Sequence, residues 1–346
     1  MKAIVTGANS LVGANLVREL LKDGHTVRAF VRPTSDTRSL DGLNIETVKG
    51  DILDLGSLIN AARGCRFMFH TAAIFSYFGH QPEAMLKVAT EGTVNAVAAA
   101  KKAKIKRIIL TSSSVVIGSS EQPIVLEETK TAPEASPEYY VSTKIQQESI
   151  GFRHAKELGV DIVSVCPTLC IGPHDYRLSE SNAIIINYLN DPFRATWPGG
   201  CNLVFAEDVA RGHILAAMRG RTGERYILGS ENLLWNKVHK MISEICGQQG
   251  PLMNATNTGA FLSGVAQELF SRFTHQRPLV TRAQAKMIGR YYWYSHERAA
   301  TELGYSPISI RQALAKTISW LVASPHVSNS LRNTITLSQE VYKERR

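Results

Sequence analysis

The first half of the chain alternates between two patterns of apolar residues. Short runs rich in Val, Ile and Phe are typical of buried strands, and longer stretches with apolar residues three or four positions apart are typical of helices. We predict strands over residues 2–6, 26–31, 45–49, 66–71, 107–111 and 161–166. We predict helices over residues 11–21, 53–62, 82–103 and 138–158. This alternation indicates an α/β fold with a doubly wound parallel sheet, covered by helices on both faces.

The pattern changes after Pro167, which ends the last of these strands. Helical periodicity then dominates, and only short strands are predicted, over residues 203–205 and 226–228. The predicted helices cover residues 207–218, 234–246, 261–273, 298–303 and 310–322. We therefore expect a first domain over residues 1–167, to which segments near 202–230 return, and a smaller, mostly helical lobe over residues 168–322. For the tail, residues 323–346, we expect a loose extension or a surface helix.

Composition narrows the class of protein. With 346 residues, of which 44% are hydrophobic, the chain can bury a full core, and a disordered chain is excluded. No apolar run approaches the ~20 residues that span a bilayer, so no transmembrane helix is expected. The first residues lack the apolar core of a signal peptide, and we expect a cytoplasmic protein. The five cysteines include no CxxC pair, which favours free thiols over a disulfide framework or a metal site.

The formal net charge of +9 suits an anionic partner. Basic residues do not gather in long runs, so we expect a small anionic ligand and neither nucleic acid nor a membrane surface.

A glycine-containing turn, TGANSLVG at residues 6–13, joins the first predicted strand to the first predicted helix. Gly7 allows a tight turn, Gly13 lets the helix pack close to the sheet, and N–H groups at the start of the helix face a pyrophosphate. Ser10 stands where the usual pattern has a glycine, and its hydroxyl can donate to a phosphate. The turn predicts a Rossmann-type dinucleotide site that includes Gly7, Asn9, Ser10, Leu11, Val12 and Gly13.

The end of the second predicted strand faces the adenosine ribose in such a fold. Arg32 follows this strand where an acid would select NAD, and a guanidinium pairs with the 2′-phosphate of NADP. Arg28 either points away or joins the edge of the same pocket. Asp51 and Ile52 follow the third strand, where they either hold the adenine or, in the case of Asp51, cap the helix expected near Leu53.

Tyr140 and Lys144 lie four positions apart, on one face of the predicted helix 138–158. A phenol with an ordinary pKa of ~10 needs a neighbouring positive charge to act as an acid–base near neutral pH. The hydroxyls at residues 111–114 follow the fifth strand, at the sheet edge where ligands bind, and one of them can orient a substrate oxygen. This combination predicts proton transfer to or from an alcohol or carbonyl.

Together these segments resemble the extended short-chain dehydrogenases/reductases over about residues 1–322. The likeness is to dihydroflavonol-4-reductase-like proteins and to the NAD-dependent epimerase/dehydratase family, including its hopanoid-associated sugar epimerases. The segments that carry it are TGANSLVG (6–13), VRAFVRPTSD (27–36), GDILD (50–54), FHTAA (69–73), TSSSVVIG (111–118), YYVSTK (139–144), CPTLCIGP (166–173), NLVFAEDVARGHILA (202–216), GERYILGSENL (223–233) and ELGYSP (302–307). They are much less specific for the substrate than for the superfamily.

The resemblance implies a role for each matching residue. Ser113 matches the active-site serine. Tyr140 matches the residue that acts as acid and base, and Lys144 matches its partner. Tyr140 and Lys144 are also expected to contact the cofactor. Arg32 matches the arginine that binds the 2′-phosphate. The residues that line the nicotinamide side are Thr71, Ala72, Ala73, Pro167 and Thr168. Residues 168–322 then correspond to the substrate-binding lobe.

Two positions depart from the family pattern. Ser10 replaces a glycine, and Ala89 replaces an asparagine that supports the catalytic helix in the family. Water or another side chain must take the place of that asparagine. His70, inside the fourth predicted strand, is interpreted as a packed core histidine.

Three functions are consistent with these residues. We favour an NADP(H)-dependent oxidoreductase, similar to dihydroflavonol reductase, that reduces a ketone or aldehyde to an alcohol; NAD(H) stays open as the cofactor. Residues 74–78, 182–188 and Phe205 predict an apolar cleft and hence an apolar substrate. The alternative is an NAD-dependent nucleotide-sugar epimerase or dehydratase. Its diphosphate would be held by arginines from the set Arg194, Arg211, Arg272, Arg277 and Arg282. The third is a non-catalytic nucleotide sensor, which an intact Ser113, Tyr140 and Lys144 disfavours; a homodimer is open in every case.

Overall fold

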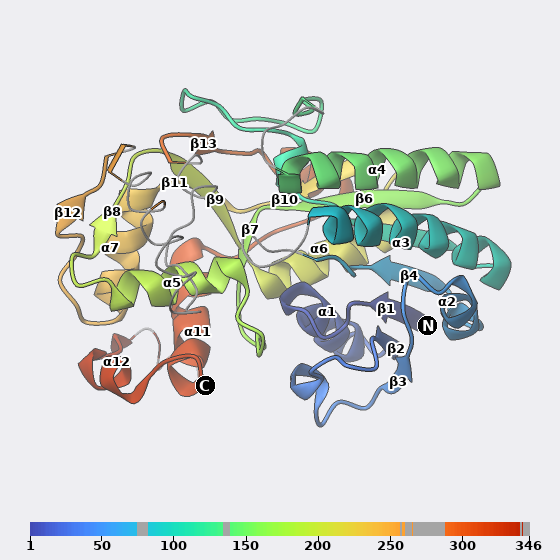
Figure 1. Ribbon diagram of the computed structural model, residues 1–346, viewed down its shortest axis with the longest axis horizontal. Helices are drawn as coiled ribbons and strands as arrows, with labels where there is room; N and C mark the ends of the chain where they lie inside the picture. The colour runs from blue at the N-terminus through green and yellow to red at the C-terminus, as the bar shows by residue number, and fades with distance from the viewer. Residues whose placement is uncertain are drawn as a thin grey trace.

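The computed structural model describes residues 1–74, 82–133, 139–256, 258–259, 265, 288–339 and 341. The described residues form two lobes (Figure 1). The larger lobe, with the N-terminus, is built on a parallel sheet, and the smaller lobe contains the C-terminal helices.

Among the described residues, seven parallel strands form the main sheet in the order β10-β6-β5-β4-β1-β2-β3. Their bounds are β1 (Lys2–Thr6), β2 (Thr26–Val31), β3 (Glu46–Lys49), β4 (Phe67–His70), β5 (Arg107–Thr111), β6 (Ile162–Pro167) and β10 (Arg225–Leu228). The chain starts in the middle of the sheet and then builds outward in both directions from β1. In such a sheet, ligands bind at the carboxyl ends of the strands beside this switch point.

Helices cover both faces of the sheet because alternate strand residues point to opposite sides. In β1, Ala3 and Val5 belong to the core beneath α1 (Leu11–Lys22), α6 (Ala206–Arg219) and α10 (Glu297–Leu303). Ile4 belongs to the core beneath α2 (Leu55–Ala62), α3 (Pro82–Ala103) and α4 (Tyr139–Leu158). The central strands β4 and β6 are thus buried along their whole length, as their apolar sequences require, whereas the edge strand β3 is mostly exposed.

The smaller lobe has a core of its own, formed largely by α5, β9, α7 and α11. Its elements are β7 (Leu169–Ile171), α5 (Glu180–Asn190), β8 (Ala195–Thr196), β9 (Gly200–Phe205), β11 (Glu231–Leu234), α7 (Trp235–Ile245), β12 (Met253–Asn254), β13 (Tyr291–Tyr292), α11 (Ile310–Ala323) and α12 (Asn329–Thr334). β9 pairs with β7, β11 and β13. Leu331 and Val341 of the tail are buried in this core, so the described part of the tail packs against the lobe instead of extending loosely.

The predicted fold class is confirmed, and the predicted strands and helices of the first half are present with small differences at their ends. The helix predicted over 261–273 lies almost wholly outside the described residues. The sequence missed α5 and most short strands of the second lobe. No helix in the described ranges is long and apolar enough to cross a membrane.

Candidate active site

The turn after β1 accepts only glycine at its first position. Gly7 has a φ of +66°, and a Cβ added there would lie 2.8 Å from the Cα of Ala72. A Cβ on Gly13 would meet the carbonyl of Gly7 and lie 2.8 Å from the Cα of Ala8. Both glycines therefore let α1 start directly against the sheet, with its amino end at the switch point.

Ser10 caps α1. Its Oγ accepts a hydrogen bond of 3.0 Å from the Gly13 N–H, which leaves the hydroxyl hydrogen for a second partner. By position, the Leu11 and Val12 N–H groups have no acceptor inside the helix and remain for an anion. Asn9 instead holds the loop after β2, because its Nδ2 donates to the Asp36 carbonyl oxygen at 3.0 Å.

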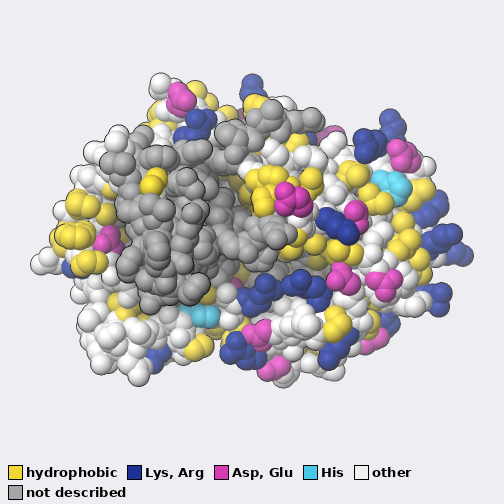
Figure 2. All heavy atoms as spheres, viewed as in Figure 1, with side chains coloured by type: hydrophobic (Ala, Val, Ile, Leu, Met, Phe, Trp, Pro, Cys, Tyr) yellow, Lys and Arg dark blue, Asp and Glu magenta, His cyan; other side chains and the backbone are white. Residues whose placement is uncertain are grey.

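Arg32 is exposed directly after β2, on the side where the sequence predicts the adenosine ribose. Arg28 turns away from that side and pairs with Glu46 on β3, its Nε 2.9 Å from a carboxylate oxygen. Asp36 accepts from Arg38 at 2.6 Å, which lowers the pKa of Asp36 to about 2. Figure 2 shows Lys and Arg side chains gathered over the part of this face where α1 lies. The surroundings of the predicted ribose site are thus cationic, with one carboxylate already paired.

Asp51 does not cap a helix, contrary to one of the two interpretations. α2 starts at Leu55, and Asp54 is its N-cap. Asp51 Oδ1 instead accepts from the Leu53 N–H at 2.9 Å, in a local turn. Ile52 is buried, at 7% exposure, beneath α3. Packing therefore accounts for Ile52, and the Asp51 carboxylate stays a candidate for the adenine edge.

The ends of β4 and β6 lie on either side of β5. Thr71 Oγ1 donates to the Thr6 carbonyl oxygen at 2.7 Å, and the Ala72 N–H donates to Thr6 Oγ1 at 3.3 Å. These bonds tie β4 to β1 at the switch point. Ala73, the next residue, is exposed. At the end of β6, Pro167 is followed by Thr168, whose Oγ1 is buried without a hydrogen-bond partner among the described residues. An unpartnered hydroxyl at this turn is consistent with a place for a cofactor amide.

The three predicted catalytic residues are brought together at the carboxyl end of β5. Ser113 and Tyr140 share a side-chain hydrogen bond. Lys144, one turn further along α4 and only 4% exposed, donates from Nζ to the carbonyl oxygen of Thr111 at 3.1 Å. The Ser113 hydroxyl also accepts a hydrogen bond of 3.4 Å from the Val115 N–H, which fixes its oxygen.

The pKa of Tyr140 is raised to about 12 because burial disfavours the phenolate, and the hydrogen bond from Ser113 offsets only part of this. The expected lowering by Lys144 is therefore wrong for the protein alone: desolvation dominates. Burial also lowers the pKa of Lys144, to about 8. The pair is thus set up as a protonated phenol beside an ammonium that titrates close to neutral pH.

One contact of this site was not predicted. Gln147 Oε1 accepts a hydrogen bond of 2.8 Å from Lys144 Nζ. The replacement at Ala89 was the only signal in the sequence that another side chain must support the catalytic helix.

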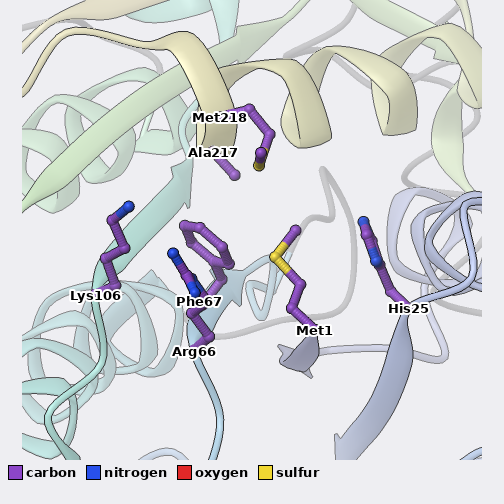
Figure 3. A pocket seen from close by; sticks show the side chains of 7 residues that line it. All are labelled: Met1, His25, Arg66, Phe67, Lys106, Ala217 and Met218. Atoms are coloured by element: carbon purple, nitrogen blue, oxygen red, sulfur yellow. The ribbon is translucent and has the colours of Figure 1, made fainter.

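Two surface hollows formed by described residues lie away from the site. One has a volume of about 360 Å³ and lies at the amino ends of β1, β4 and β5, on the opposite edge of the sheet (Figure 3). Its lining residues are Met1, His25, Arg66, Phe67, Lys106, Ala217 and Met218. A second, of about 390 Å³, lies on the smaller lobe beside Asp191 and Thr334.

The residues present fit a nicotinamide dinucleotide. The glycine turn admits no side chain, and the first amides of α1 suit a pyrophosphate. No described residue hydrogen-bonds the Thr168 hydroxyl. The Lys144 ammonium has three N–H donors. Among the described residues, the Thr111 carbonyl oxygen and Gln147 Oε1 each accept a hydrogen bond from it.

Comparison with known proteins agrees with this geometry. The chain matches the model of the NAD dependent epimerase/dehydratase family over residues 3–229. It is 36% identical over 321 residues to the protein named "Putative dihydroflavonol 4-reductase" from Synechocystis sp., covering 91% of this chain and 93% of that protein. It is 31% identical over 324 residues to sterol demethylase protein B from Methylococcus capsulatus, and the match covers 92% of this chain and 98% of that protein. The crystal structure of gox2253 superposes with a TM-score of 0.82 at 32% identity, covering 94% and 99%. The chain therefore belongs to the NAD dependent epimerase/dehydratase family, within the extended short-chain dehydrogenases/reductases.

Proposed function

We propose that this protein is an NADP(H)-dependent reductase that converts a ketone or aldehyde to an alcohol. The observation that carries the proposal is the cluster of Ser113, Tyr140 and the buried Lys144 at the carboxyl end of β5, with Tyr140 held in its protonated form. A relative named as a dihydroflavonol 4-reductase supports the same reaction class.

Each of the three side chains has a separate task in reduction. A bound nicotinamide supplies the hydride that the carbonyl carbon takes up. Ser113 donates a hydrogen bond to the carbonyl oxygen, and Tyr140 gives that oxygen its proton. Lys144 binds the cofactor ribose and stabilises the negative charge left on Tyr140. A pKa near 12 keeps Tyr140 a proton donor throughout the neutral range, as the direction from carbonyl to alcohol requires.

Phe205 and its neighbours no longer support an apolar substrate. Phe205 is 2% exposed, and Ile185, Ile186 and Tyr188 are buried with it in the core of the smaller lobe. They cannot line an open cleft. Residues 75–78 lie outside the described part of the chain. An apolar ketone as substrate therefore rests on the printed names of the relatives, which include a dihydroflavonol reductase and a sterol demethylase protein.

The alternative, epimerisation of a nucleotide sugar, has less support from the arginines. Arg211 lies on α6 in the larger lobe and pairs with Glu19 on α1 at 2.8 Å, so it does not face a substrate in the smaller lobe. Arg194 donates to the Gln249 carbonyl oxygen at 3.0 Å. The other three candidates, Arg272, Arg277 and Arg282, lie outside the described residues. Neither described arginine is placed for a diphosphate.

Cofactor titration tests the proposal. Because Arg32 is exposed where the 2′-phosphate is expected, NADPH should bind about tenfold more tightly than NADH. Arg32→Ala should remove that preference and leave NADH affinity unchanged, measured by quenching of tryptophan fluorescence. Arg28→Ala is the matched control, since Arg28 turns to β3, and it should keep the preference. Equal affinities for the two cofactors in the parent protein would contradict NADP(H) as the cofactor.

A further inference from the structure

Lys144 is held by two acceptors that come from different parts of the fold. Its ammonium has three N–H donors. One donates to the Thr111 carbonyl oxygen, which the sheet fixes at the end of β5, and one donates to Gln147 Oε1. The direction of Nζ is therefore set by Thr111 and Gln147 together, and the described residues leave one of its donors available for a ligand.

Gln147 lies one turn after Lys144 on α4 and is 1% exposed. Since Lys144 can only donate, the contact fixes which end of the Gln147 amide faces it. The other end, Nε2, donates to Thr93 Oγ1 on α3 at 3.3 Å. Gln147 thus connects the lysine to a second helix and cannot turn without losing a buried hydrogen bond.

The chain of polar contacts continues across the sheet to the glycine turn. Thr93 Oγ1 lies 3.4 Å from His70 Nε2, and His70 Nδ1 lies 2.9 Å from Thr6 Oγ1. Thr6 is the last residue of β1, directly before Gly7. Thr6, His70, Thr93 and Gln147 are each at most 1% exposed, so this is a fully buried row of side chains between Lys144 and the turn.

The charged and titratable groups around Lys144 come from several elements. Glu148 on α4 and Cys166 on β6 raise the pKa of Lys144, while burial lowers it more. His70 on β4 has its pKa lowered to about 4 by burial and by Lys144 itself, and is neutral in the working range. Tyr140, on the same helix, keeps its proton. Gln147 is therefore a neutral hydrogen-bond acceptor beside Lys144, and it favours the charged form of that lysine.

We propose that Gln147 is the positioning residue of Lys144: it holds the ammonium charged and aimed at the cofactor side, and it ties that lysine to the glycine turn through Thr93, His70 and Thr6. This inference rests on the proposed function, in which Lys144 binds the cofactor ribose. The row does not conduct protons, because a carboxamide neither gains nor loses a proton near neutral pH. Its role is geometric and electrostatic.

The pH dependence of NADPH binding tests the proposal without any substrate. NADPH affinity should weaken as the pH rises through the pKa of Lys144, measured by fluorescence between about pH 6 and about pH 10. Gln147→Leu removes one acceptor of the charged lysine, so the midpoint should fall by about one pH unit, with affinity about tenfold weaker on the alkaline side. Gln147→Glu keeps the acceptor and adds a negative charge, so the midpoint should rise. Gln146→Leu, at an exposed neighbouring glutamine, should leave the midpoint unchanged.

Opposite shifts in the two Gln147 variants support the proposal, because a merely structural defect would move both in the same direction. If Gln147→Leu does not fold, the proposal is tested by Gln147→Glu alone, which should raise the pH midpoint of NADPH binding. An unchanged midpoint in the Gln147 variants, with pH-dependent binding in the parent, overturns the positioning role and leaves the proposed function standing. If the parent binds neither NADPH nor NADH, the proposed function fails, and this inference fails with it.

Discussion

Tyr140 is a phenol whose surroundings preserve its proton. Burial raises its pKa to about 12, and Ser113 compensates only in part. A proton donor is needed when a carbonyl is reduced, whereas oxidation of an alcohol needs the phenolate. At the scale of this residue, the proposed function therefore predicts that reduction is faster near neutral pH and that the reverse reaction requires more alkaline conditions.

Tyr140→Phe tests this role by removing the proton and keeping the ring. We expect turnover to fall by about 10²-fold or more, while NADPH affinity changes by less than about twofold. Ser113→Ala should cost less, since Tyr140 can still reach the oxygen. Steady-state kinetics with any accepted carbonyl substrate, together with a fluorescence titration, measures both quantities. Full turnover in Tyr140→Phe would exclude Tyr140 as the acid.

Lys144 links stability to pH. Its pKa is lowered from 10.5 to about 8 on folding, so the unfolded chain binds more protons between these values, and stability from this group rises with pH across that window. Lys144→Met should therefore change the pH slope: the difference in unfolding free energy between parent and variant should vary by on the order of 3 kcal/mol from about pH 7 to about pH 10.5. Urea unfolding at several pH values measures it.

The control for this slope is Lys156→Met, at an exposed lysine on the same helix. For Lys156→Met, the difference in unfolding free energy between parent and variant should stay nearly constant over the same pH range. If the unfolding free energy of Lys144→Met also differs from that of the parent by a constant amount, the lowered pKa of Lys144 is contradicted.

Single residues show what the sequence can and cannot predict about the site. Spacing along one helix predicts that Tyr140 and Lys144 share a face. The strand-end position of residues 111–114 predicts a hydroxyl beside them, and only the family resemblance selects Ser113 from these four. Gln147 was not predicted because its partner Thr93 lies on another helix, and only the packing of α3 against α4 brings the two side chains together. The sequence also did not predict that the pKa of Tyr140 is raised, because desolvation depends on all the residues packed around the phenol.

At the scale of elements, the start of α1 combines a structural and a ligand role. Ser10 caps the helix, and the next amides face the predicted pyrophosphate. Ser10→Ala should lower the unfolding free energy by about 1 kcal/mol, whereas Ser10→Gly should cost only a few tenths. Chemical denaturation of the three proteins measures this difference. Equal losses in the two variants would contradict the capping role.

Strands and helices of the larger lobe were predictable because each is long enough for its apolar period to appear. β2, α3 and β5 have the bounds that the pattern predicts. The smaller lobe was less predictable, because β8, β12 and β13 contain two residues each and exist only through pairing with distant segments. Leu331 and Val341 of the tail were missed because isolated apolar residues carry no period, although both are buried.

At the scale of the whole molecule, the two lobes have separate cores, and the predicted catalytic cluster lies in the larger lobe, at the carboxyl end of β5. A net charge of +9 favours the approach of a polyanionic dinucleotide. The fold alone is shared by reductases and epimerases, so the reaction depends on the site and must be decided by chemistry.

The most direct test follows the fate of NADPH. The purified protein is incubated with stoichiometric NADPH and a panel of bulky ketones, and in parallel with NAD+ and nucleotide sugars. Absorbance at the reduced nicotinamide band and the sugar products are monitored in both series. A reductase consumes NADPH in proportion to the alcohol formed with at least one ketone, and Tyr140→Phe abolishes most of this consumption. Epimerised sugar in the series with NAD+, without net formation of NADH, and no consumption of NADPH with any ketone would contradict the proposed function.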